Sequence, residues 1–216
     1  MGAALSEQLV RTWVAGWAQC RGYTPQDNGR SMSVVLTDQQ NHLETIVYEP
    51  TIGEFLELAG ETRESSYRVL TVITNRMHDL INASAPLHMR ITDYEQALMC
   101  ADMDEQDVED PRPPDDEFKL AHIREEHCRR VSVTVDGQEV ASGSVARQDG
   151  HAVYDRIITD PGYRRRGLGS FVMRALTADI LEDDVETGLL MASESGRHLY
   201  QYLGWTHLAD TFVIRR

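Results

Sequence analysis

One segment of the sequence points to the architecture of the whole chain: Thr159-Asp-Pro-Gly-Tyr-Arg-Arg-Arg-Gly-Leu-Gly-Ser-Phe-Val-Met-Arg-Ala-Leu-Thr177. Within it, the pattern Arg164-x-x-Gly167-x-Gly169 stands at the expected start of a helix. Glycines at a helix N-terminus let free backbone N–H groups approach an anion, and the helix dipole attracts negative charge. The three consecutive arginines add donors and positive charge at the same place. The segment therefore predicts a loop that binds a pyrophosphate.

Two other glycine motifs do not fit this segment. A P-loop would carry Lys-Ser or Lys-Thr after its last glycine, but Gly169 is followed by Ser170 and Phe171. A dinucleotide fingerprint would need a third glycine at position 172, which is a valine. The remaining alternative is an ordinary strand–turn–helix unit with a charged, exposed loop.

The flanking sequence has the elements that such a loop requires. His151–Thr159 is rich in β-branched residues and predicts a strand, which the turn residues Asp160-Pro-Gly162 would end. Gly188–Ala192 is a short apolar run, and Ser195–Leu203 predicts a short helix with a Ser cap and a C-terminal glycine. The helix after the loop has one apolar face, made of Leu168, Val172, Ala175, Leu176 and Ile180.

This order of motifs resembles the GNAT N-acetyltransferase superfamily. The resemblance covers roughly residues 131–214 and includes the helix ending Leu199-Tyr-Gln-Tyr-Leu-Gly-Trp205. It implies an α/β (α+β) fold, with a mixed, mostly antiparallel GNAT-type sheet flanked by helices. It also implies acetyl-CoA as a co-substrate, no metal, and transfer of an acyl group to a primary amine by direct attack on the thioester.

The resemblance assigns roles to individual residues. The backbone of Ile157, Ile158 and Thr159 would pair with the pantetheine arm of acetyl-CoA. Tyr200 would be the general acid that protonates the leaving thiolate, because a phenol with a pKa of about 10 stays protonated at neutral pH. Ser193 stands where many members carry an asparagine. The pyrophosphate would lie on the loop formed by Arg164, Arg165, Arg166, Gly167, Leu168, Gly169 and Ser170.

The general base is not assigned by the resemblance. Relatives often place a glutamate where this chain has Gly188 or Val153. Asp155, Glu194 or His198 could substitute, although each is also explained as a surface charge. The missing carboxylate leaves an alternative function open: a non-catalytic acyl-CoA-binding module that regulates or interacts with a partner.

The sequence also predicts two halves joined by a linker. Residues 102–117 are acidic and contain three prolines, so they predict a linker between an N-terminal half (1–101) and a GNAT domain (118–216, the C-terminal half). The N-terminal half repeats the order of elements, and is either a degenerate GNAT-like copy or an unrelated α/β domain. Its counterpart of the phosphate loop, Pro50–Phe55, has one glycine and an acid. If the halves mimic a dimer, we expect a monomer. The elements expected before the linker are strands at 32–37, 43–48, 67–74, 87–92 and 96–103, and helices at 51–59 and 76–83.

An amphipathic helix is expected at the start of the chain, over residues 5–20. Leu9, Trp13, Trp17 and Cys20 follow one another at spacings of four, four and three, so they form one apolar face. A tryptophan stripe of this kind is typical of core packing. We expect this helix to seal one half against the other, or to cover the sheet.

Composition narrows the location and the partners. The formal net charge is −14, and residues 1–117 carry 8 basic and 21 acidic side chains against 13 and 14 in residues 118–216. Such a balance argues against nucleic acid as a partner. Its field would attract a small-molecule or peptide amine acceptor that is cationic, and the alternative is an acidic surface that only keeps the protein soluble. The absence of a membrane-length apolar run and of a secretory pattern predicts a cytoplasmic protein with no membrane partner. The three cysteines are too far apart for a zinc site, so no metal is expected.

Overall fold

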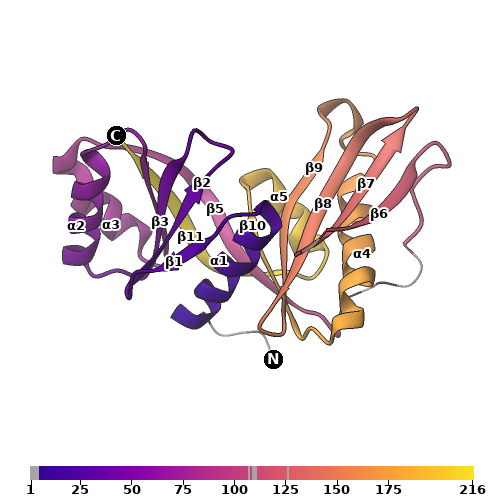
Figure 1. Cartoon of the computed structure of the whole chain (residues 1–216), viewed down its shortest axis with the longest axis horizontal. Coiled ribbons are helices and arrows are strands. Elements are labelled where there is room, and N and C mark those ends of the chain that lie inside the picture. The colour runs from indigo at the N-terminus through magenta and orange to yellow at the C-terminus, as the bar shows by residue number, and fades with distance from the viewer. Residues whose placement is uncertain (1–4, 107, 109–110, 126) are drawn as a thin grey trace.

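The computed structural model describes residues 5–106, 108, 111–125 and 127–216 (Figure 1). The linker is therefore described only at 102–106, 108 and 111–117. The elements follow one another as α1 (Glu7–Arg21), β1 (Pro25–Asp27), β2 (Ser31–Leu36), β3 (His42–Tyr48), α2 (Ile52–Arg63), β4 (Arg68–Thr74), α3 (Met77–Ser84), β5 (Arg90–Asp102), β6 (Lys119–Arg124), β7 (Arg129–Val135), β8 (Gln138–Gln148), β9 (His151–Thr159), α4 (Leu168–Ile180), β10 (Thr187–Ala192), α5 (Glu194–Tyr202) and β11 (Thr206–Arg215).

All these strands belong to one continuous sheet. Its strand order is β1-β2-β3-β4-β11-β5-β10-β9-β8-β7-β6. The neighbouring strands run antiparallel except for two parallel pairs, β3 with β4 and β9 with β10. The expected mixed, mostly antiparallel sheet flanked by helices is thus confirmed.

The order of strands is nearly the same when read from either end of the sheet. The series β2-β3-β4-β11 on one side mirrors β8-β9-β10-β5 on the other, with the same sequence of parallel and antiparallel pairs. Each half therefore gives its last strand to the other half: β5 pairs with β10, and β11 pairs with β4. Removing either strand would leave unpaired edges in both halves. The division at 101 and 118 stays a prediction.

Helices cover both faces of this sheet. One face packs against α4 and α5 in the C-terminal half and against α2 and α3 in the N-terminal half. The other face packs against α1, which lies in front of the middle of the sheet in Figure 1. Side chains alternate between the two faces along β5, where Leu98 faces α1 and Met99 faces the α4 side.

Helix α1 packs against both halves, as expected from its apolar face. Ser6 caps it by accepting a hydrogen bond from the Leu9 N–H at 3.2 Å. Trp13 and Trp17 are buried in a core that includes residues of the N-terminal half and Val153 of β9. The close approach to β9 depends on Gly16, because a Cβ there would lie 2.4 Å from the Val153 side chain.

Three local expectations were wrong. The strands expected at 87–92 and 96–103 form the single strand β5, which continues past Asp93 at φ 55°, because a register shift against β11 absorbs the irregularity. This strand begins only at Arg90, because residues Ala85–Leu87, which include Pro86, form a 3₁₀ turn. The cap of α5 is Ser193 and not Ser195. Four strands, β6 to β9, precede α4 in the C-terminal half, whereas the order of elements in the sequence predicts three.

The tight packing of α1 predicts opposite effects for two glycine substitutions. Gly16→Ala should cost about 1–3 kcal/mol, because the new methyl group overlaps the fully buried Val153. Gly60→Ala, in α2 with open space around it, should stabilise by about 0.5–1 kcal/mol through helix propensity. Thermal unfolding would measure both, at about 2–4 °C per kcal/mol for a chain of this length. An unchanged midpoint for Gly16→Ala would contradict the packing of α1 on β9.

Candidate functional site

The site begins where the parallel strands β9 and β10 separate. They are paired from His151–Tyr154 with Thr187–Leu190, and beyond that point β9 runs on to Thr159 without β10. A bulge coincides with the separation: Ser142 and Ser144 of β8 face Ile158 and Asp155 of β9, so β9 contains one extra residue. Arg156, within this bulge, has a φ of 53°. The segment Ile157–Thr159 therefore borders an opening in the sheet.

The arginine- and glycine-rich loop lies at the end of this opening. Gly167 is the N-cap of α4 with a φ of 81°, and no side chain caps the helix. The backbone N–H groups of Leu168, Gly169 and Ser170 are thus not satisfied by a capping side chain, which leaves them available to an anion. Arg164, Arg165 and Arg166 are exposed next to them. Gly169 also permits close packing, because a Cβ there would lie 2.9 Å from Leu199 of α5.

An acidic residue of the linker contacts this loop. The Arg166 guanidinium forms an ion pair with the Glu117 carboxylate. It also lies over the rings of Phe118 and Tyr163, at 4.7 Å and 5.6 Å from their centroids. The loop is therefore in contact with a carboxylate at the position of one of its three arginines, and a phosphate arriving there would compete with Glu117.

Tyr200 of α5 lies on the inner side of the opening. Its side chain is 7% exposed and packs against the Trp205 ring at 6.2 Å between centroids. Burial, with a smaller contribution from the Asp155 carboxylate, raises the pKa of Tyr200 to about 12. The phenol is therefore protonated at neutral pH. Tyr202, two residues further, is 80% exposed and points away from the core.

Ser193 has a structural role as well as a place in the site. Its hydroxyl accepts a hydrogen bond from the Gly196 N–H at 3.2 Å and so caps α5. Its Oγ also lies 3.3 Å from the Ser195 Oγ. Ser193 also lines the same cavity as Tyr200. Because it caps α5, it fixes the start of this helix at the edge of the site.

A cavity of about 360 Å³ passes through the sheet at the separation of β9 and β10. Tyr154, Leu190 and Tyr200 line it on the α4 side. Its larger part lies on the α1 side and is lined by residues of both halves. From the N-terminal half these include Trp13, Trp17, Arg21, Glu44, Thr71, Asp93 and Gln96, and from β11 Val213 and Arg215. The volume falls in the range of small-molecule sites.

Sequence reasoning allowed the N-terminal half to form a wall of the substrate site, but it named none of the residues that this half contributes to the cavity. The order of strands in the sheet places Glu44 of β3 and Arg215 of β11 in the same cavity as Tyr200, and no local motif marks them. None of the three residues that could substitute for the general base is free within the cavity: one is held in an ion pair, and two are exposed on the surface. Asp155 accepts two hydrogen bonds from Arg21, at 2.7 Å and 2.9 Å, and Glu194 and His198 are exposed on α5.

Sequence comparison identifies the family of this site. A model of the acetyltransferase (GNAT) domain matches residues 127–207, which include β9, the loop, α4, β10 and α5. Residues 127–207 form a domain of the GNAT superfamily. No curated protein matches the chain in sequence.

Solved structures extend the GNAT likeness over the whole chain. A GCN5-related N-acetyltransferase from Kribbella flavida has a TM-score of 0.68 at 16% identity, covering 98% of this chain and 95% of its own. A tandem GNAT protein from the clavulanic acid biosynthesis pathway has a TM-score of 0.56 at 12% identity, covering 99% and 97%. A functionally unknown conserved protein from Staphylococcus epidermidis has a TM-score of 0.63 at 12% identity, covering 90% and 94%. At these identities the likeness shows the fold alone.

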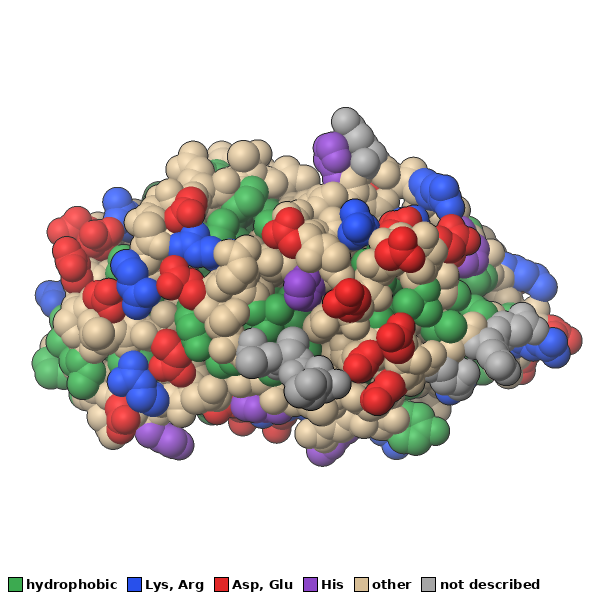
Figure 2. Space-filling model, turned by 90° about the horizontal axis from the view of Figure 1, so that it is seen from below, with side chains coloured by type: hydrophobic (Ala, Val, Ile, Leu, Met, Phe, Trp, Pro, Cys, Tyr) green, Lys and Arg blue, Asp and Glu red, His purple; other side chains and the backbone are tan. Residues whose placement is uncertain are grey.

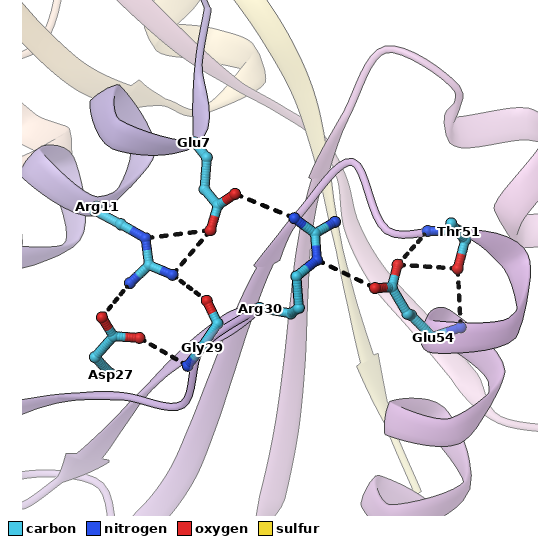
Figure 3. Close-up of polar contacts among 7 residues, drawn as sticks. All are labelled: Glu7, Arg11, Asp27, Gly29, Arg30, Thr51 and Glu54. Carbon is cyan, nitrogen blue, oxygen red and sulfur yellow. Dashed lines mark hydrogen bonds and ion pairs between the residues drawn. The ribbon is translucent and has the colours of Figure 1, made fainter.

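The N-terminal half carries a GNAT-like counterpart of the loop, and it is closed. Ile52-Gly-Glu-Phe55 begins α2 as Leu168-Gly-Ser-Phe171 begins α4. Here Thr51 accepts a hydrogen bond from the Glu54 N–H, while the Glu54 carboxylate accepts from the Thr51 N–H at 2.8 Å (Figure 3). These bonds and the Arg30 guanidinium lower the pKa of Glu54 to about 2. A fixed carboxylate thus occupies the position that an anion would need.

Charged side chains of both signs lie on the surface of the molecule. Acidic and basic side chains are scattered over the face seen from below in Figure 2. Many arginines are held in surface ion pairs, for example Arg30 with Glu7 and Arg76 with Glu49. In the described residues, no helix is long and apolar enough to cross a membrane, and no three His, Cys, Asp or Glu side chains are grouped as a metal site.

Proposed function

We propose that the protein transfers an acetyl group from acetyl-CoA to a primary amine. The observation that carries this proposal is the opening between β9 and β10, which has an uncapped, arginine-flanked helix start at one end and a buried, protonated phenol at the other. The pyrophosphate would bind the N–H groups of Leu168–Ser170, with the arginines beside it. The pantetheine arm would follow Ile157–Thr159 towards Tyr200.

The reaction needs only groups that line the opening. The lone pair of the neutral amine attacks the thioester carbonyl carbon, and a carbon–nitrogen bond forms while negative charge develops on the oxygen. The carbon–sulfur bond then breaks, and the Tyr200 O–H donates its proton to the sulfur. The nitrogen loses one proton, which returns to the Tyr200 oxygen through water. The products are an N-acetyl amine and the CoA thiol, and holding both reactants in line supplies much of the rate.

A second function has one observation in its favour. The positions at which relatives often carry a glutamate base hold Gly188 and Val153, so the chain could bind acyl-CoA without turning it over. Asp155 cannot serve readily as the base while Arg21 holds both of its oxygens. The two functions differ in whether the phenol of Tyr200 matters, which one substitution can test.

Binding of acetyl-CoA should stabilise the fold through the loop. At about a hundred times Kd the ligand should add roughly 2.7 kcal/mol, which raises the unfolding midpoint by several degrees. In Gly169→Glu this shift should be lost, because the added carboxylate repels the pyrophosphate. Differential scanning fluorimetry with and without acetyl-CoA would measure it.

The matched control for that experiment is Gly53→Glu. Gly53 is the second residue of α2, as Gly169 is of α4, and has open space around it. Its substitution adds the same charge at the equivalent place in the closed half, so the acetyl-CoA shift should remain. Equal shifts in all three proteins would place the ligand elsewhere.

Removal of the Tyr200 hydroxyl should slow transfer without weakening acetyl-CoA binding. Tyr200→Phe should lower kcat by more than about tenfold, since general acid catalysis typically contributes a factor of about 10²–10⁴. Tyr202→Phe, on the same helix with an exposed side chain, should change little. Thiol release from acetyl-CoA in the presence of a panel of amines would be the assay. Acetyl-CoA binding with no thiol release in the wild-type protein would favour the non-catalytic function.

A further inference from the structure

Two of the three cysteines pack against each other, although they are far apart in the sequence. Cys20 is in the last turn of α1, and Cys128 immediately precedes β7. Together with Ala146 of β8 they form a small buried cluster of their own. Each of the two side chains is 7% exposed, and both thiols are free. The fold therefore creates a pair of neighbouring thiols that the spacing in the sequence does not indicate.

The order of strands explains why the two side chains meet. Ala146 of β8 pairs in register with Val153 of β9, and on its other side β8 pairs with β7, which begins directly after Cys128. The Cys20 Sγ lies 3.7 Å from the Val153 carbonyl oxygen. Cys20 thus reaches the sheet beside the small side chain of Ala146, where Cys128 is its neighbour.

Hydrogen bonds hold the two segments together around the thiols. The Gln19 side-chain amide donates to the His127 carbonyl oxygen at 2.5 Å, and the Cys128 thiol donates to the Glu125 carboxylate at 3.3 Å. A hydrogen bond to Cys128, together with burial, raises the pKa of Cys20. Cys20 therefore stays a thiol, whereas the proton of Cys128 faces a carboxylate that can accept it.

An oxidant can reach both sulfur atoms from the surface. Cys128 lines a cavity of about 270 Å³, together with Arg124 and Arg129. Cys20 lines a second cavity of about 330 Å³, and Glu125 lines both. The thiol pair thus lies between two openings, each of which can admit a molecule as small as hydrogen peroxide.

We propose that Cys20 and Cys128 form a disulfide bond when a peroxide oxidises the protein, and that this bond fixes the C-terminal end of α1 to the start of β7. The observation that carries the proposal is the packing of the two thiols against each other, with a carboxylate beside one of them and a cavity at each. It does not depend on the proposed function.

Hydrogen peroxide accepts the two electrons that the disulfide requires. The Cys128 thiol gives its proton to Glu125, and its sulfur attacks one peroxide oxygen. The oxygen–oxygen bond breaks, and the departing hydroxide takes the proton from Glu125 and leaves as water. The Cys20 sulfur then attacks the sulfur of the sulfenic acid at Cys128, so the sulfur–sulfur bond forms, the sulfur–oxygen bond breaks, and the hydroxyl leaves as water with the Cys20 proton. Two thiols and one peroxide give one disulfide and two water molecules.

The new bond would lie next to the candidate site. Arg21, which follows Cys20, donates two hydrogen bonds to Asp155, and both residues line the site cavity. Trp17, one turn earlier in α1, lines it as well. Oxidation would therefore hold this end of α1 over the cavity by a covalent bond in addition to packing.

Thiol counting on the folded full chain tests the proposal. After treatment with hydrogen peroxide and removal of the excess, denatured wild-type protein should give one free thiol in place of three with dithionitrobenzoate, and dithiothreitol should restore all three. Mass spectrometry of unreduced peptides should find the peptide of Cys20 linked to that of Cys128. The unfolding midpoint should rise by about 5–15 °C, because the bond closes a loop of about 100 residues in the unfolded chain.

Single substitutions give the matched controls. Cys100→Ala keeps the pair and should lose both of its remaining thiols; Cys100 lies elsewhere, in β5 beside Thr206. Cys20→Ala and Cys128→Ala should form no disulfide, and peroxide should not raise their midpoints, whatever the midpoints are before treatment. Because the same peroxide oxidises methionines in all variants, the rise in the wild-type protein is then due to the disulfide. In Cys20→Ala, dimedone should label Cys128 as a sulfenic acid.

Several outcomes would overturn the proposal. They are three thiols that survive oxidation, thiols lost without any linked peptide, and a linkage that involves Cys100 or joins two chains. A Cys20–Cys128 bond that leaves the midpoint unchanged would contradict the fixing of α1 to β7. A dimedone label on Cys20 in Cys128→Ala, with none on Cys128 in Cys20→Ala, would contradict the order of the two attacks.

Discussion

The antiparallel pairing of β5 with β11 at the centre of the sheet positions every other part of the site. These are the last strands of the two halves, and each lies in the sheet of the opposite half. Because β11 and β5 are interposed between β4 and β10, the two pairs of parallel strands lie on either side of this central pair in one sheet. The cavity forms there, and α1 covers it. Residues as distant in sequence as Glu44, Tyr200 and Arg215 thereby line one space.

The two halves have the same backbone arrangement at the starts of α2 and α4, but the two helix starts differ in whether they can bind an anion. Helices α2 and α4 start after a parallel strand with the same apolar–Gly–x–Phe sequence. In α4 the first turn follows three arginines and a glycine N-cap, so its N–H groups are open to an anion. In α2, Thr51 and Glu54 form a capping box that satisfies the same groups and adds a negative charge. The start of α2 therefore has the same place in the fold as the start of α4, but its N–H groups are not open to an anion.

The sequence predicted those elements that are determined by neighbouring residues along the chain. The strand 151–159, the turn after it and the helix α4 follow from periodicity, turn residues and caps, and the GNAT resemblance predicted their order. The course of β5 past Asp93 was not predictable, because pairing with β11 rather than propensity keeps the chain in the sheet. Neither was the place of Glu44 in the cavity, which depends on strands that meet only through the exchange. The cap at Ser193 was missed because Ser195 offers the same chemistry two residues later.

The most direct test of one open and one closed anion site is the stoichiometry of acetyl-CoA binding. Isothermal titration calorimetry of the full chain, with its concentration fixed by absorbance, would count the sites. We expect one acetyl-CoA per chain, because Glu54 and Thr51 close the helix start in the N-terminal half. Two molecules per chain would mean that both halves bind the co-substrate, and would contradict the division of labour between them. No binding would contradict the assignment of the Arg164–Ser170 loop itself.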